Sequence, residues 1–146
     1  MLADIDRDVR EIEVVKSDGS RIPATLTLWT ESPSEAERVE LLLETEEATF
    51  SVVERDFWKA LVGLREMLET KELRPVVYGA SRNVTGSDKS IELSYGLYGY
   101  RLTLGKLAVR EDLVNIFETG DDVDPTLVSE QLEFAQQWFD SLQPAQ

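Results

Sequence analysis

The sequence predicts an α+β domain, in which a mostly antiparallel sheet carries two main helices on one face. Short segments of alternating apolar and polar residues follow one another with turn signals between them, one helical pattern lies mid-chain, and a second closes the chain. Strands do not alternate with helices, so a doubly wound nucleotide-binding fold is not expected. The 146 residues suffice for one core, and we expect a single domain over residues 1–146.

The first two strands are predicted to form a hairpin. The opening of the chain also fits helical spacing, but the turn signal at residues 16–19 favours a strand over residues 9–16. Apolar and polar residues then alternate over residues 22–28, which is typical of a strand with one apolar face. Pro23 has no backbone N–H to donate, so we expect this strand, or at least its start, to lie at a sheet edge.

A second hairpin and a helix are predicted next. Residues 39–44 alternate as a strand, residues 46–47 form a turn, and residues 48–52 return as the antiparallel partner. The helix that follows ends near Thr70, because Pro75 disfavours helical geometry in the residue before it. The buried stripe of this helix is spaced by four, three and four residues and consists of Phe57, Leu61, Leu64 and Leu68.

Shorter elements are predicted in the second half. The pattern indicates extended backbone over residues 76–78 and a loop over residues 79–90. Two strands, over residues 91–95 and 100–104, are expected to pair through a connection at residues 96–99, whose glycines allow positive φ.

The chain is predicted to close with a strand over residues 113–117 and a helix. Asp124 suits the N-cap position of that helix and Pro125 suits its first turn. The apolar side of the helix is expected to consist of Val128, Leu132, Ala135, Phe139 and Leu142.

Charge is spread unevenly along the chain. The formal net charge is −14, yet residues 71–110 carry seven Lys or Arg against three acids, whereas residues 111–146 carry nine acids and no base. Such acidity disfavours binding to nucleic acid or to an anionic membrane, because both need a cationic protein face. It favours a basic protein partner, although acidity can also serve solubility alone.

Several chemistries are excluded by residues that the chain lacks. It has no Cys and no His, which removes disulfides, zinc–thiolate sites, the usual general base and the Ser-His-Asp triad. Only carboxylate, Lys, Tyr or Ser/Thr–Lys chemistry is left, so enzymatic activity stays open while a non-enzymatic role is favoured. We expect no cofactor. No apolar run is long enough to span a bilayer, and a cytoplasmic location is the default expectation.

The segment of residues 78–84 is the first candidate for a ligand-binding site. Tyr78, Ser81, Arg82 and Asn83 place a phenol, a hydroxyl, a guanidinium and an amide within six residues. Such donors can bind a carboxylate or a phosphate, with Arg82 as the fixed charge. The alternative is that Ser81 and Asn83 make local turn hydrogen bonds while Arg82 is solvated.

Tyr98, Tyr100 and Arg101 complete the candidate ligand-binding set, beside Gly96 and Gly99. Tyrosine, glycine and arginine are typical of recognition loops, because rigid rings supply contact area at low entropic cost. The alternative is ordinary hairpin composition, in which tyrosines occupy strand positions and one ring packs in the core.

Four carboxylates near residue 120 form a candidate metal site. Glu118, Asp121, Asp122 and Asp124 could supply oxygen ligands for Ca²⁺ or Mg²⁺. Their spacing departs from the EF-hand pattern, and Asp124 is already assigned as a helix cap, so we expect no metal site.

Acidic residues also mark a candidate surface for a protein partner. Residues 31–56 have a net charge of −7, and the residues that we expect to contact a partner are Glu40, Glu44, Glu46 and Glu47. The alternative is a solvated face that serves solubility.

Two segments of the C-terminal half resemble a known family. Residues 78–84 read YGASRNV, and residues 99–106 read GYRLTLGK, followed by EDLVNIF at residues 111–117. In these segments the chain is similar to a small bacterial family of uncharacterised function, which implies a bacterial origin and supplies no catalytic residues that could be assigned here. In size, acidity and α+β pattern the chain also resembles immunity proteins that neutralise basic bacterial toxins; this likeness is an analogy without a shared motif.

The sequence favours a non-enzymatic protein-binding domain of a bacterial cytoplasmic protein, with a toxin as one candidate partner. The alternative is a small-molecule or anion-binding domain centred on Arg82, with carboxylate-based catalysis as an option. A third interpretation is a nucleic-acid mimic that uses its carboxylates in place of phosphates. The sequence leaves the oligomeric state open.

Overall fold

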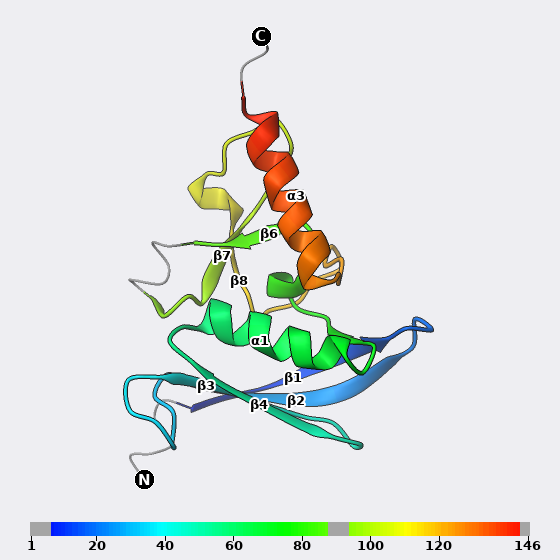
Figure 1. Cartoon of the computed structure of the whole chain (residues 1–146), viewed down its shortest axis with the longest axis vertical. Helices are drawn as coiled ribbons and strands as arrows, with labels where there is room; N and C mark the ends of the chain where they lie inside the picture. The colour runs from blue at the N-terminus through cyan, green and yellow to red at the C-terminus, as the bar shows by residue number, and fades with distance from the viewer. Residues whose placement is uncertain (1–6, 88–93, 144–146) are drawn as a thin grey trace.

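A five-stranded antiparallel sheet forms one layer of the structure, with strand order β4-β3-β2-β1-β5 (Figure 1). The computed structural model describes residues 7–87 and 94–143. The strands of this sheet are β1 (Arg7–Lys16), β2 (Arg21–Trp29), β3 (Val39–Glu44), β4 (Thr49–Glu54) and β5 (Leu73–Pro75). The two hairpins expected from the first half of the sequence are therefore confirmed.

Helix α1 (Phe57–Glu69) covers one face of this sheet. Its carboxylate cap, Asp56, accepts the backbone N–H of Lys59 at 2.9 Å, which satisfies one of the free donors of the first turn. The stripe that spacing predicted is buried against the sheet, and it meets the inward residues of the strands, including Leu26, Leu41 and Phe50. Burial of this apolar surface drives the packing of the two layers.

Pro23 lies in a central strand, but its own position is an edge position. It pairs with Glu13 of β1 on one side, whereas pairing between β2 and β3 starts only at Thr25, opposite Glu44. Residues 21–24 thus have a neighbouring strand on one side only. The missing N–H of Pro23 therefore costs no sheet hydrogen bond on the open side. The expectation is confirmed for the start of the strand and wrong for the strand as a whole.

A smaller sheet and the last helix lie on the side of α1 away from the large sheet (Figure 1). The small sheet has the order β6-β7-β8. Its strands are β6 (Val84–Gly86), β7 (Tyr98–Arg101) and β8 (Leu113–Asn115), with the short 3-10 helices η2 (Tyr78–Ala80) and η3 (Arg110–Asp112) and the helix α3 (Val128–Ser141) around them. With its two sheets and two main helices, the protein has the predicted α+β fold.

Several predictions for residues 76–104 were wrong. The expected loop over residues 79–90 contains η2 and β6, and the extended segment starts earlier than expected, as β5. Tyr95 is not in a strand but in a turn, with φ of 57°; residues 91–93 of that predicted strand lie outside the described residues. β7 pairs with β6 and β8. Three-residue strands are too short to leave an alternating pattern in the sequence.

The predicted start of the closing helix was also wrong. α3 begins at Val128, and the carboxylate of Glu130 accepts the backbone N–H of Leu127 at 3.0 Å and the hydroxyl of Thr126 at 2.6 Å. The first turn is thus stabilised by a side chain within the helix. Asp124 does not cap the helix, because it lies beside Arg82 instead.

The apolar side expected for α3 faces solvent over much of its length. Leu132 is 67% exposed and Phe139 is 55% exposed, while the buried residue of the helix is Gln131. Among the described residues, no helix combines the length and apolar character needed to cross a membrane.

Candidate functional site

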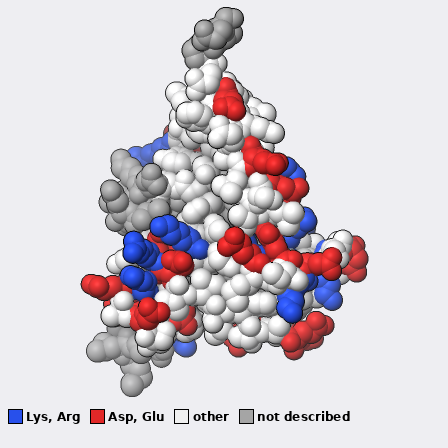
Figure 2. Space-filling model, in the orientation of Figure 1, with Lys and Arg blue, Asp and Glu red and all other residues white. Residues whose placement is uncertain are grey.

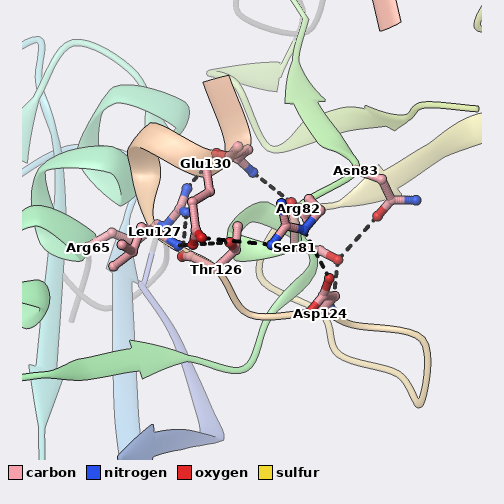
Figure 3. Close-up of polar contacts among 9 residues, drawn as sticks. Arg65, Ser81, Arg82, Asn83, Asp124, Thr126, Leu127 and Glu130 are labelled. Carbon is pink, nitrogen blue, oxygen red and sulfur yellow. Dashed lines mark hydrogen bonds and ion pairs between the residues drawn. The ribbon is translucent and has the colours of Figure 1, made fainter. Parts of the chain in front are cut away.

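Arg65 lies where α1, η2 and the start of α3 meet (Figure 3). Its side chain is 1% exposed. Nη1 donates to the carbonyl of Gly79 at 3.2 Å and to Oε1 of Gln131 at 2.6 Å, and Nη2 donates to the carbonyl of Thr126 at 3.0 Å. Gln131 in turn donates its amide hydrogens to the carbonyls of Gly79 and Ser81, each at 2.9 Å. This Arg65–Gln131 junction joins three segments that are far apart in the sequence.

The guanidinium of Arg65 is held by neutral oxygens. Burial lowers its pKa to about 10, although the nearby carboxylates of Glu69 and Glu66 oppose that shift. Glu69 accepts the backbone N–H of Val128 at 2.8 Å, which gives α3 a second attachment to α1. Because Arg65 is enclosed, we assign it a structural role in holding the segment at residues 78–83 in place.

Ser81, Arg82 and Asn83 lie beside this junction, to the right of Arg65 in Figure 3. The hydroxyl of Ser81 accepts the backbone N–H of Asp124 at 2.9 Å and donates to Oδ1 of Asn83 at 3.2 Å. Nε of Arg82 lies 3.4 Å from the carboxylate of Asp124, and Nη2 lies 3.9 Å from that of Glu130. Ser81 and Asn83 therefore make the local hydrogen bond that the alternative interpretation predicted. Arg82 is half-exposed and is also paired with carboxylates.

Tyr78 and Arg101 meet at a second point of the same segment. The phenol of Tyr78 donates to Oδ1 of Asp122 at 2.7 Å, and Nη2 of Arg101 lies 3.2 Å from Oδ2 of the same carboxylate. The guanidinium of Arg101 also stacks over the Tyr78 ring, 4.7 Å from its centroid. Gly120 leaves room for this arrangement, because a Cβ at that position would force the hydroxyl of Tyr78 to shift.

The hydrogen bond between Tyr78 and Asp122 shifts the pKa of both side chains. It raises the pKa of the Tyr78 phenol above its ordinary value of 10 and lowers the pKa of the Asp122 carboxyl below its ordinary value of 3.8. Arg101 acts in the opposite direction on Tyr78, because a cation favours the phenolate. The net effect keeps Tyr78 protonated at neutral pH, so the residue is a hydrogen-bond donor and not a base.

We expect Asp122→Asn to lower the pKa of Tyr78, with Asp121→Asn as a control that leaves it unchanged. Subtracting the alkaline absorbance titration of Tyr78→Phe from each titration isolates this phenol. Because folding raises its pKa, the stability that Tyr78 contributes is present below pH 10 and is lost as the pH rises through the raised value. Equal Tyr78 titrations in the two Asn variants would show that the Asp122 contact is absent in solution.

The structure divides the predicted ligand-binding set among separate places. Tyr78 and Arg101 meet at Asp122, whereas Arg82 contacts Asp124 and Glu130. Tyr98 and Tyr100 alternate with Arg101 along β7, so they point to the other face of the small sheet. Clefts of about 500 and 540 Å³ elsewhere in the fold are not lined by any of these residues. Anion binding by Arg82 stays a prediction, and an incoming anion would compete with two carboxylates.

Two of the four candidate metal ligands serve other contacts. Asp122 and Asp124 each lie beside an arginine. Within residues 7–87 and 94–143, no three acidic side chains converge as a group that could hold a metal ion.

The predicted partner-binding glutamates lie on and beside the outer face of the large sheet, which is the face away from α1. Glu40 and Glu44 are on this face in β3, and Glu46 and Glu47 occupy the turn to β4. Glu40 is half-buried and accepts the hydroxyl of Ser32 at 2.6 Å, while the other three are exposed.

Sequence reasoning missed Arg65 and Gln131, although the signal for Arg65 was present. It lies four residues after Leu61 and three before Leu68, which places it at the margin of the buried stripe of α1. A buried guanidinium at such a position needs oxygen acceptors from another element. Compared with known proteins, the chain matches no protein-family model and no curated sequence.

Proposed function

We propose that the protein is a non-enzymatic protein-binding domain that engages a basic protein partner through the outer face of its five-stranded sheet. The observation that carries the proposal is the openness of this face. In the described part of the chain, the helices and the smaller sheet all lie on the opposite side (Figure 1).

Four apolar side chains gather toward one end of the outer face, among charged and polar neighbours. Strand register places Val9 of β1 beside Thr27 and Leu42, and in the adjacent row Trp29 of β2 lies between Arg7 and Glu40, with Val53 beyond. Val9 is 53% exposed, and Leu42, Trp29 and Val53 are half-buried. Apolar side chains gathered across four neighbouring strands are typical of a surface that another protein covers.

Carboxylates lie beside these apolar side chains. Glu11 and Glu44 flank Thr25 in the next row, Glu13 follows beside Pro23, and the β3–β4 turn adds Glu46 and Glu47. Arg21 neutralises Glu13 at 3.1 Å, which leaves this part of the face acidic on balance. A partner that fits has an apolar patch with Lys or Arg beside it. A basic toxin, as the analogy with immunity proteins suggests, is one protein of this kind.

The test is capture of a partner from an extract of the native cell, followed by binding kinetics. We expect wild-type protein to capture a basic protein at low salt and to release it at high salt. The double variant Glu44→Lys/Glu46→Lys should lower the association rate roughly tenfold or more, because steering depends on the charge of the docking face. Leu42→Asp should weaken the complex mainly by faster dissociation.

The matched control is Glu111→Lys/Glu133→Lys, which makes the same change in net charge on exposed residues away from the sheet. This control should retain most of the association rate. Equal losses in both double variants would point to non-specific attraction by net charge and would remove the sheet face as the docking site.

A further inference from the structure

A cleft of about 500 Å³ lies at the β5 edge of the large sheet. It is bounded by the end of the β1–β2 hairpin, by the end of α1 together with β5, and by the segment that leads into α3. These parts of the chain gather at the right-hand side of the molecule in Figure 1. The volume is typical of sites for small molecules, which are about 300–1,000 Å³. The glutamates expected to contact a partner lie toward the opposite edge, at β3 and β4, and none of them lines this cleft.

Bases outnumber acids among the residues that line this cleft, although the whole chain has 29 acids and 15 Lys or Arg. The charged residues of the lining are three bases and two acids: Lys16, Arg21, Arg74, Glu69 and Glu72. Glu69 is engaged within the fold, because it accepts the backbone N–H of Val128 at 2.8 Å. On the right-hand side of Figure 2, basic side chains lie among acidic ones, so the attraction for an anion is local to the cleft.

Arg74 is a half-buried base that lacks an oxygen partner. Among the described residues its side chain makes no hydrogen bond or ion pair, and its charge interacts with the carboxylate of Glu130 only at longer range. In the same described part of the chain, the half-buried Lys16 makes no side-chain hydrogen bond either, and its charge acts on Asp18 from a distance. A cation that is partly removed from water normally gains oxygen acceptors in return. Both side chains therefore have donors to offer to a ligand.

Strand register brings a second guanidinium to the same place. Val15 of β1 pairs with Arg21 of β2 on one side and with Arg74 of β5 on the other. Residues paired in this way share one face of the sheet. Neighbouring strands are about 4.8 Å apart, so the two arginine backbones are separated by about 10 Å, which two long side chains can span to hold one anion between them. The ion pair of Arg21 with the exposed Glu13, at 3.1 Å, is of the kind that contributes little stability and is easily exchanged.

We propose that this cleft binds a small organic phosphate monoester, with Arg74 as the central contact. Such a phosphate group has a charge of about −1.5 to −2 at pH 7, which suits several bases better than a single carboxylate does. The cleft is larger than a phosphate group alone, and Val15, Leu73 and Leu127 supply apolar surface for the organic part. The exposed carboxylate of Glu72 is placed to accept a hydrogen bond from a hydroxyl group of the ligand.

The cleft of about 540 Å³ is less suited to an anion. Its lining has two bases, Arg38 and Arg55, and two acids, Glu31 and Glu37, so its charges balance. Arg38 also donates to the carbonyl of Glu37 at 3.1 Å, so it has an oxygen partner that Arg74 lacks. Since Arg38 is half-buried like Arg74, it provides a matched position for a control variant.

The first test is the thermal unfolding midpoint of the full chain over a range of phenyl phosphate concentrations, at constant ionic strength. We expect phenyl phosphate to raise the midpoint and the effect to follow a binding curve, because the ligand binds the folded state. Benzoate, which has the same ring and a single charge, should raise it much less. Arg74→Gln should weaken phenyl phosphate binding roughly tenfold or more, because charge-assisted hydrogen bonds to the phosphate are lost. Its midpoint without ligand should stay near that of wild type.

Two control variants make the same change in charge elsewhere. Arg38→Gln alters the other cleft, and Arg82→Gln alters the anion site predicted from the sequence; both should bind phenyl phosphate as wild type does. Equal losses in all three variants would show that net charge alone attracts the ligand. Loss of binding in a control with binding kept in Arg74→Gln would place the anion elsewhere. No effect of phenyl phosphate on wild type, or an equal effect of benzoate, would also overturn the proposal.

The second test locates the ligand by amide signals of ¹⁵N-labelled protein. Gly19 lines the cleft, whereas Gly105 lies in the loop beside α3, and both are turn glycines, with φ of 87° and 81°. Addition of phenyl phosphate should shift the Gly19 signal and leave the Gly105 signal in place. An unmoved Gly19 signal, or equal shifts of the two, would contradict binding in this cleft. This readout does not depend on the sheet-face proposal, because the glutamates of that face do not line the cleft.

Discussion

Replacing Arg65 with alanine is expected to lower the free energy of unfolding by about 3–4 kcal/mol. The substitution leaves the carbonyl of Thr126 and Oε1 of Gln131 buried without a donor, at about 1–3 kcal/mol each. It also opens a cavity in a fully enclosed position, which removes contacts between α1 and α3. Relief from burying the guanidinium offsets part of this loss.

Urea unfolding monitored by tryptophan fluorescence measures the effect of this substitution. Arg55→Ala is the control, since Arg55 is exposed just before α1, and its loss should stay within about 0.5 kcal/mol. A change below about 1 kcal/mol in Arg65→Ala would mean that the buried hydrogen bonds contribute little net stability, contrary to their assigned role.

Replacing Gly79 with alanine is expected to destabilise the fold by about 2–3 kcal/mol through overpacking. A Cβ at this position would collide with a methyl group of Leu61 and would lie 2.8 Å from Cβ of Ile116. It would also lie 3.1 Å from the backbone oxygen of Ile116, which accepts the N–H of Gly79 at 2.9 Å. Since Leu61 and Ile116 are fully buried, neither has room to move aside.

Gly63→Ala in α1 is the matched control for that substitution and should change stability in the opposite direction. A Cβ there would meet Val52 at 3.4 Å, an ordinary contact distance, and alanine is favoured over glycine inside a helix by about 0.5–1 kcal/mol. Thermal unfolding of both variants gives the comparison. If Gly79→Ala unfolded at the temperature of wild type, the close packing between η2 and α1 would not exist in solution.

The length of each helix or strand decided whether the sequence could predict it. β1 and β2 have ten and nine residues; alternation identified β2, and the turn signal at residues 16–19 identified β1 and the hairpin. β6 has three residues and ends at Gly86, and β7 contains Gly99, so glycines that signal turns lie here within strands. The reason is spatial: a Cβ on Gly99 would lie 2.5 Å from the carbonyl of Thr85 in the neighbouring strand.

The start of α3 shows how a tertiary contact can override a local signal. Asp124 and Pro125 have the composition of a helix start. In the structure Arg82 and Ser81 contact Asp124, and Pro125 forms an isolated bridge with Ser81. No spacing within residues 124–128 could reveal partners that lie more than forty positions earlier in the chain.

The sequence predicted the position of the candidate site, but it did not predict which side chains contact each other there. The segment at residues 78–83 does gather polar contacts, as its composition suggested. Asp122 joins Tyr78 to Arg101, and Gln131 joins the segment to Arg65, over separations of 44 and 66 residues. Such pairings depend on how layers stack, which periodicity within one element does not encode.

The polar attachment of α3 affects the free energy of its local opening and the heat-capacity change of that opening. Gln131 is the one fully buried residue of this helix and its apolar residues are half-buried or exposed, so detaching α3 would expose less apolar surface than unfolding the large sheet. A transition that exposes little apolar surface has a small heat-capacity change, and its free energy varies only weakly with temperature and denaturant. α3 should therefore open locally, at a cost that cooling and mild denaturant barely alter, well before the core around α1 unfolds.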